Sequence, residues 1–240
     1  MTACSWQPQW LQDARCAIDE LQVWRGVETQ HISATMQLVD TADEQDLLEQ
    51  MLEESKPPLP PQGAAHKHYL LTTPFRYTPQ TASRFRSAGQ RGLWYGARQL
   101  RAACAEVAYW RMMFILDSAG LQKSRLTSQH TFFAAHVHEV GINLQAKPWS
   151  ALRTAWVDGQ SYAQTHRLAR AARSAEIQII QYESVRSPGD TNFAVFTPDA
   201  LDEPPGGIAA SEQAWICSAG KDHVLMWSGR DSRQRFEWTR

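Results

Sequence analysis

The sequence carries almost no excess charge of either sign. Its 24 Lys and Arg residues are balanced by 25 Asp and Glu residues, which gives a formal net charge of -1 over 240 residues. Proteins that hold DNA, RNA or an acidic membrane surface through a broad electrostatic field need a positive excess. The composition therefore predicts no direct binding to nucleic acid and no membrane attachment of that kind.

Cysteine is also scarce, and no C-x-x-C pair occurs, which argues against a zinc knuckle and against a small disulfide framework. The four cysteines are Cys4, Cys16, Cys104 and Cys217. Long apolar runs are absent as well, because the strongest apolar cluster, 112–116, lies between Arg111 and Asp117. The first residues show no basic start followed by an apolar stretch. We expect a soluble, cytoplasmic protein.

The remaining composition is that of a globular protein with one sizeable core. Hydrophobic residues make up 43% of the chain and charged residues 20%. A long helix is predicted from about residue 97 to Gly120, and a second helix over 161–174. The long helix carries an apolar stripe that we expect to face the core, formed by Leu100, Ala103, Val107, Trp110 and Phe114.

Alternating and β-branched stretches predict strands between and after these helices. The predicted strands are 69–73, 132–140, 177–185, 192–196 and 224–227. The order of helices and strands indicates an α+β fold built on a mixed or antiparallel sheet. We predict a single domain, with an N-terminal helical segment and proline-rich crossing over 1–62 and the main part of the fold over 63–240.

The N-terminal segment contains an acidic helix. Residues 40–54 hold seven acidic residues and no basic one, and Thr41 with Glu44 has the form of a capping box. We expect this helix to pack on the core with its acidic face in solvent; the alternative is a docking surface for a basic partner. The prolines of 55–63 exclude a helix or a central strand and mark a linker or surface crossing.

Glu106 is the carboxylate that the pattern explains least well as a surface residue. Its helical neighbours three and four positions away are Ala102, Ala103, Tyr109 and Trp110. A carboxylate facing such side chains is partly desolvated and needs a cation or several donors to meet it. Either a structural ion pair with an arginine or a functional role would account for Glu106.

An arginine-rich loop precedes the long helix. Arg84, Arg86 and Arg91 lie in a glycine-containing stretch that suits an anion, although no phosphate-cradling motif is present. Trp94 and Tyr95 follow, and either stack on a planar ring or belong to the core.

Ser184 shares a strand face with Tyr182, where its hydroxyl either points into a site or bonds the adjacent turn. Without a G-x-S-x-G elbow, Ser184 is not predicted to be an acyl-transfer nucleophile.

The histidines are candidate ligands of a metal ion. His136 and His138 lie on one face of a predicted strand, with His130 upstream, so they could form a fragment of a metal site. No recognised spacing places a third ligand beside them, and we predict no metal.

Taken in order, five short segments resemble the RES-domain family, which is named for an arginine, a glutamate and a serine. They are Thr73–Tyr77, Ser83–Arg86, Gly92–Ala97, Ala105–Val107 and Gln181–Arg186. The segment that begins with residues 23–31 and ends at Lys56 also resembles the N-terminal part of longer members of this family. The resemblance therefore extends from about residue 20 to residue 200.

The resemblance implies a toxin of a bacterial toxin–antitoxin pair that consumes NAD, with a fold like that of ADP-ribosyltransferases. It implies that NAD is cleaved at the nicotinamide–ribose bond as a substrate, with no prosthetic group, by a glycohydrolase, a phosphorylase or a mono-ADP-ribosyltransferase. The implied partner is an Xre-like helix-turn-helix antitoxin, and the chain forms either a homo-oligomer or a hetero-oligomer with that antitoxin. The alternative is a catalytically weak RES protein that acts as a regulatory binding partner of a helix-turn-helix protein.

Carried over by position, the resemblance assigns catalysis to Arg84, Glu106 and Ser184. It assigns NAD binding to Arg84, Tyr95, Arg25, Arg86 and Asn192. The choice between Arg84 and Arg86 stays open, because the loop from Arg84 to Tyr95 is one residue longer than in many members. In these roles Glu106 stabilises the ribose cation, the arginines grip the pyrophosphate, and Ser184 orients the reacting centre.

Overall fold

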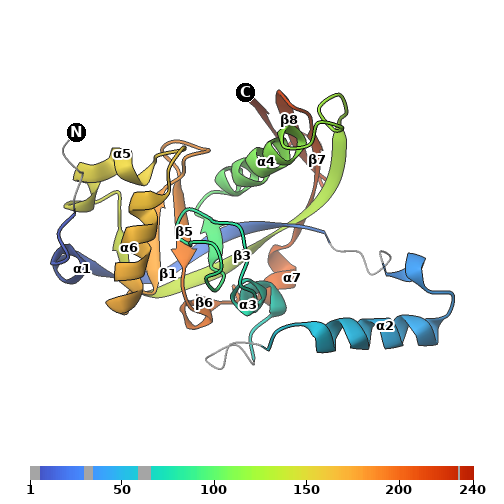
Figure 1. Cartoon of the computed structure of the whole chain (residues 1–240), viewed down its shortest axis with the longest axis horizontal. Coiled ribbons are helices and arrows are strands. Elements are labelled where there is room, and N and C mark those ends of the chain that lie inside the picture. Colours follow the sequence, from blue (N-terminus) through green and yellow to red (C-terminus); the bar gives the residue numbers. More distant parts are fainter. Residues whose placement is uncertain (1–5, 30–34, 59–65, 232) are drawn as a thin grey trace.

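A nine-stranded sheet organises the residues that the computed structural model describes, which are 6–29, 35–58, 66–231 and 233–240 (Figure 1). The strands are β1 (Arg15–Glu28), β2 (Trp94–Ala97), β3 (Leu126–Asn143), β4 (Ile179–Glu183), β5 (Thr191–Val195), β6 (Leu201–Asp202), β7 (Gln213–Ala219), β8 (His223–Ser228) and β9 (Arg235–Thr239).

The strand pairing closes on itself. β1 pairs with both β2 and β3, β2 pairs with β5, β5 with β4, and β4 with β3. These five strands therefore form a ring, in which β3–β4 is the parallel pair and the other pairs are antiparallel. β3 is long enough at 18 residues to leave the ring and continue the sheet through β7, β8 and β9, while β6 pairs with its middle.

Helices surround this sheet (Figure 1). They are α1 (Trp10–Asp13), α2 (Ala42–Ser55), α3 (Tyr69–Arg76), α4 (Leu100–Leu116), α5 (Arg153–Trp156), α6 (Ala163–Ser174) and α7 (Gly207–Ser211), with 3-10 turns at Met36–Leu38, Trp149–Leu152 and Pro198–Ala200. Across the described ranges, none of these helices has the length and apolarity that crossing a bilayer requires.

α4 packs on the sheet through small side chains. Its buried residues are Ala102, Ala103, Cys104, Ala105, Ala108, Met112 and Ile115, and all of them except Ala105 form a cluster with side chains of β3, β7 and β8. Because alanines dominate this face, the helix axis can come close to the strands. The predicted apolar stripe faces the core only in its first part: Ala103 belongs to this cluster, and Leu100 and Val107 pack against it. For Trp110 and Phe114 the prediction is wrong, because their side chains are 53% and 54% exposed.

The sheet confirms most of the predicted elements. The predicted strands at 132–140, 177–185, 192–196 and 224–227 correspond to β3, β4, β5 and β8, and the predicted helices correspond to α4 and α6 with shifted ends. The α+β fold class with a mainly antiparallel sheet is confirmed.

Two segments differ from the prediction. Residues 69–73 form the first part of the helix α3, not a strand, because Leu71 and Phe75, four residues apart, both turn into the core. The N-terminal segment predicted to be helical contains the 14-residue strand β1, whose alternation is broken by a register shift between Ile18 and Leu21.

The acidic helix forms as predicted but does not pack on the core. In α2, Thr41 and Glu44 make both hydrogen bonds of a capping box, and no residue of the helix is buried. Leu47 and Met51 are 57% and 59% exposed, and the helix extends away from the sheet in Figure 1. The expected packing is therefore wrong. Of the predicted crossing at 55–63, residues 59–63 lie outside the described residues.

Matched leucine substitutions test this arrangement. Leu71→Ala removes a side chain with 0% exposure in α3 and is expected to lower the free energy of unfolding by about 2–5 kcal/mol. Leu47→Ala in α2 is expected to change it by about 0.5 kcal/mol or less. Chemical denaturation of both variants measures the difference. An equal loss of unfolding free energy in both variants would contradict the finding that α2 does not pack on the core.

Candidate active site

A cavity of about 510 Å³ opens between α4, β1, β2 and the ends of β4 and β5. We call it the α4 cavity. Of the residues that the resemblance assigns to the site, Arg25, Arg84, Tyr95, Glu106 and Asn192 line this cavity, and Ser184 and Arg86 do not. These residues come from segments up to 167 positions apart. The closed strand ring carries Arg25 on β1, Tyr95 on β2 and Asn192 on β5, while Arg84 lies in the loop before β2 and Glu106 on α4.

Glu106, in the middle of α4, is held by two donors. Its Oε1 accepts a hydrogen bond from Asn192 Nδ2 at 2.9 Å and one from Ser184 Oγ at 3.4 Å. Ser184 Oγ also accepts from the Ser187 backbone N–H at 3.1 Å, which leaves the hydroxyl proton for Glu106. Ser184 and Asn192 are 1% and 2% exposed. The carboxylate is thus fixed by the end of β4 and by β5.

Burial dominates the electrostatics of Glu106. Desolvation raises the pKa of its carboxyl above the ordinary value, although Arg186 and Arg84 and the hydrogen bonds from Asn192 and Ser184 act in the opposite direction. The partly desolvated carboxylate inferred from the alanine and aromatic neighbours is therefore present. Arg186 and Arg84 act on it electrostatically across the cavity, and neither appears among the ion pairs of the described residues within 4.0 Å.

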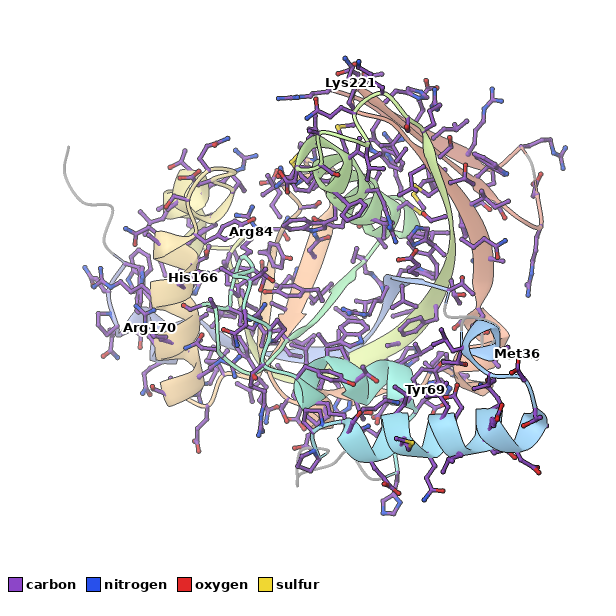
Figure 2. The ribbon with its side chains drawn as sticks, turned by 45° about the vertical axis from the view of Figure 1, so that its right-hand side comes forward. Met36, Tyr69, Arg84, His166, Arg170 and Lys221 are labelled. Atoms are coloured by element: carbon purple, nitrogen blue, oxygen red, sulfur yellow. The ribbon has the colours of Figure 1, made fainter. Side chains whose placement is uncertain are left out.

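Arg84 is a rigid part of the cavity wall. Its Nη1 donates to the backbone carbonyls of Trp156 and Asp158, each at 2.9 Å, and its guanidinium lies 5.1 Å from the centre of the Tyr162 ring. In Figure 2 Arg84 lies between α6 and the strands. Anchored in this way, the cation keeps its position before any ligand arrives.

Arg25 occupies the wall formed by β1. Its Nη1 donates to the Tyr95 carbonyl at 2.8 Å, and its guanidinium lies 5.6 Å from the centre of the Trp94 ring. Burial lowers the pKa of Arg25 to about 10, so that the side chain is still cationic at neutral pH.

Tyr95 fastens the arginine loop to β2. Its hydroxyl lies 2.9 Å from Ser83 Oγ and accepts a hydrogen bond from the Phe85 backbone N–H at 3.1 Å, so it holds the residues on both sides of Arg84. Burial raises the pKa of this hydroxyl. His166 of α6 bonds the Ser83 carbonyl at 2.7 Å and supports the loop from the other side.

Arg86 does not line the cavity. Its guanidinium is buried and donates to the carbonyls of its own loop, those of Pro79, Thr81, Ser87 and Gln90. Between the two arginines that the sequence left open, the structure brings Arg84 to the cavity and uses Arg86 to shape the loop.

Several cavity residues were not predicted. Arg186 lies over the Tyr109 ring, with its guanidinium carbon 3.3 Å from the ring centre, and it lines the cavity. The sequence did offer one indication of this role, because Arg186 lies two residues after Ser184 in a segment that carries the family resemblance. Tyr162 also lines the cavity, but it precedes α6 in a polar stretch that gives no local signal.

His136 and His138 each lie beside a carboxylate. His136 Nδ1 bonds Glu20 at 2.6 Å, and His138 Nε2 lies 2.8 Å from an Asp202 oxygen. Over the ranges that the structure describes, no cluster of three or more His, Cys, Asp or Glu side chains could hold a metal ion. His130 lies apart from these pairs, in the wall of the α4 cavity, where burial lowers its pKa to about 4.

Comparison with known proteins agrees with this architecture. The sequence model of the RES domain matches residues 60–216, more than half of the chain, and the chain belongs to the RES domain family. Among solved structures, it is similar to the toxin of the MbcT–MbcA toxin–antitoxin complex of M. tuberculosis, with a TM-score of 0.51 and 11% identity over 81% of this chain and 87% of that one. This likeness shows the fold. No curated protein matches the sequence.

The buried guanidinium of Arg86 gives a test of the loop. Arg86→Ala leaves several loop carbonyls without their donor and is expected to lower the free energy of unfolding by about 1–3 kcal/mol. Hydrogen exchange should show faster opening of residues 79–90. Arg91→Ala, which removes an exposed arginine of the same loop, is the matched control. An unchanged stability in Arg86→Ala would contradict the structural role.

The raised pKa of Glu106 predicts a pH-dependent stability. Because the folded carboxyl holds its proton more tightly than the unfolded one, stability falls as pH rises from the ordinary glutamate pKa through the folded value. Glu106→Gln removes this loss, so it should raise the melting temperature at pH 7 and raise it less at pH 4.

Glu183→Gln is the matched control with the opposite sign. Its hydrogen bonds with Arg153 lower the pKa of Glu183, so its contribution is present above the ordinary pKa and is lost as pH falls. The substitution should destabilise the protein at pH 7 and have little effect in acid. A Glu106→Gln variant that also loses stability at pH 7 would contradict the desolvated carboxylate.

Proposed function

We propose that this RES protein cleaves NAD at the bond between nicotinamide and ribose and passes the ADP-ribose unit to an acceptor. The observation that carries the proposal is the position of Glu106, a carboxylate fixed by Asn192 and Ser184 in the wall of a cavity that Arg25, Arg84 and Arg186 also line. NAD is the substrate in this reaction, and no resident cofactor is needed.

The chemistry of NAD suits a site with one carboxylate. Its nicotinamide ring is already cationic, so the glycosidic electron pair passes to the ring nitrogen and neutral nicotinamide leaves without a general acid, unlike ordinary glycoside hydrolysis. Positive charge develops on the ribose as the bond breaks. Glu106 is placed to stabilise that charge, and its partial desolvation strengthens the interaction.

The cations of the cavity suit the pyrophosphate of the substrate. Arg25, Arg84 and Arg186 line the cavity, and guanidinium groups bind phosphate oxygens through charge-assisted hydrogen bonds. Backbone carbonyls hold Arg84 and Arg25 in place, so little side-chain freedom is lost when the phosphates bind.

Ser184, Asn192 and Tyr95 act through other residues in this proposal. Ser184 and Asn192 orient Glu106, and Tyr95 holds the loop that carries Arg84. Arg86 supports the same loop from within.

The acceptor is water, phosphate or a protein side chain. With water, its oxygen forms the new bond to the ribose carbon, one proton passes to solvent, and the products are nicotinamide and ADP-ribose.

An antitoxin partner completes the proposal. The similar MbcT chain occurs in a toxin–antitoxin complex, and we infer that this chain acts in the cytoplasm as a toxin held inactive by an Xre-like helix-turn-helix protein. The exposed α2, with Leu47 and Met51 among acidic side chains, favours a second role as a regulatory binding half that meets a basic partner surface. The two roles are compatible, and NAD turnover decides whether catalysis is one of them.

The proposal is tested by incubating purified protein with NAD and following nicotinamide and ADP-ribose. Glu106→Gln keeps the shape of the side chain and removes its charge, so turnover should fall about 10²–10³-fold, the usual cost of removing a preorganised electrostatic contact. Glu54→Gln, on exposed α2, is the matched control and should retain full turnover. Expression of the native chain should deplete NAD and arrest a bacterial host, and expression of Glu106→Gln should not.

Absence of NAD cleavage by the native chain would refute the catalytic proposal and leave the regulatory binding role. Cleavage that survives in Glu106→Gln would refute the role of Glu106 alone.

A further inference from the structure

Two large aromatic side chains line the α4 cavity although they are more than half exposed. Trp110 and Phe114 lie one and two turns of α4 beyond Glu106, on the same helix face, and all three residues line the cavity. Such exposure is unusual for side chains of this size and points to contact with a ligand or a partner.

The spacing gives the cavity a direction. With a rise of about 1.5 Å per residue, Trp110 lies about 6 Å and Phe114 about 12 Å along the helix from Glu106. Trp24 of β1 and His130 of β3 line the same cavity opposite the helix. The cavity therefore continues past the carboxylate into an aromatic region, which we call the aromatic end and define by Trp24, Trp110, Phe114 and His130.

The aromatic end carries little net charge. Arg111 of α4 forms an ion pair with Glu28 of β1 there, and the lowered pKa of His130 keeps its imidazole neutral at pH 7. The guanidinium groups of Arg25, Arg84 and Arg186, which form no ion pair with a carboxylate of the described residues, belong to the part of the cavity around Glu106 and Tyr95. Phosphates are therefore favoured near Glu106, and a flat uncharged ring is favoured at the aromatic end.

We propose that the aromatic end binds the adenine ring of the substrate, while Glu106 faces the ribose that carries nicotinamide. The inference rests on the proposed NAD cleavage and adds the site for the half of the substrate that does not react. Trp110 and Phe114 offer flat faces for stacking, which tolerates any planar base and needs no charge. Binding energy gained there holds the reacting bond beside Glu106.

The site is tested on Trp110→Ala and Phe114→Ala, whose exposed side chains can be removed without opening the core. Each variant is expected to raise KM for NAD about tenfold, the scale of one base-stacking contact, with little change in kcat. Calorimetry should show the same loss of affinity for ADP-ribose and no change for ribose 5-phosphate, which lacks the base. Trp110→Phe should restore much of the affinity.

Tyr69→Ala is the matched control, because Tyr69 of α3 is 64% exposed and lies well away from Arg84 in Figure 2. It should change neither KM nor the affinity for ADP-ribose. A fall in kcat with unchanged KM and unchanged ADP-ribose binding would overturn the adenine site. So would an equal loss for ADP-ribose and ribose 5-phosphate.

The binding measurement separates this inference from the proposed activity. A native chain that does not cleave NAD but binds ADP-ribose through Trp110 would sink the catalytic proposal and retain the adenine site. A native chain that binds no ADP-ribose would overturn the adenine site.

Discussion

The site depends on one constraint: a carboxylate on α4 must reach two donors on the neighbouring strands while water is largely kept from it. Asn192 Nδ2 lies 2.9 Å from Glu106, which is possible because the alanine face of α4 brings the helix close to the sheet. The antiparallel pairing of β4 with β5 brings Asn192 and Ser184 to the same oxygen of Glu106, and β1 and β2 bring Arg25 and Tyr95 to the same cavity. A larger residue at Ala102 or Ala105 would move the carboxylate away from its donors.

The arginines divide between two tasks that their chemistry makes distinct. Arg86 donates hydrogen bonds to the carbonyls of one loop and so stabilises the shape of that loop. Arg84 and Arg25 are each held by hydrogen bonds to backbone carbonyls, and both guanidinium groups line the cavity. A guanidinium held by backbone carbonyls keeps its charge fixed in space, which is the preorganisation that an anionic ligand requires. The desolvation that raises the pKa of Glu106 is the cost of the same enclosed geometry.

The sequence predicted the central residues of the site but not all of the residues that line the cavity around them. Glu106 stood out because a carboxylate among alanines and aromatics violates the usual helix pattern, and ordered segments pointed to Arg84 and Ser184. Periodicity correctly placed Trp110 and Phe114 on one face, but it does not distinguish a core from the wall of a cavity, so their environment was wrong. Tyr162 enters the site through a contact with Arg84, 78 positions away in the chain, which no local pattern encodes. The strand β1 was not predicted because a register shift interrupts its alternation of buried and exposed residues. The helix α3 was predicted as a strand because it contains residues that favour strands, although its buried residues follow helical spacing.

The most direct measurement is a crystal structure of the native chain with an NAD analogue in which a methylene group replaces the oxygen of the nicotinamide ribose ring, since such a compound resists cleavage. The account predicts the nicotinamide ribose within hydrogen-bond distance of a Glu106 carboxylate oxygen, with the pyrophosphate beside Arg84 or Arg25. An analogue bound outside the α4 cavity, or bound inside it with the ribose turned away from Glu106, would contradict the account.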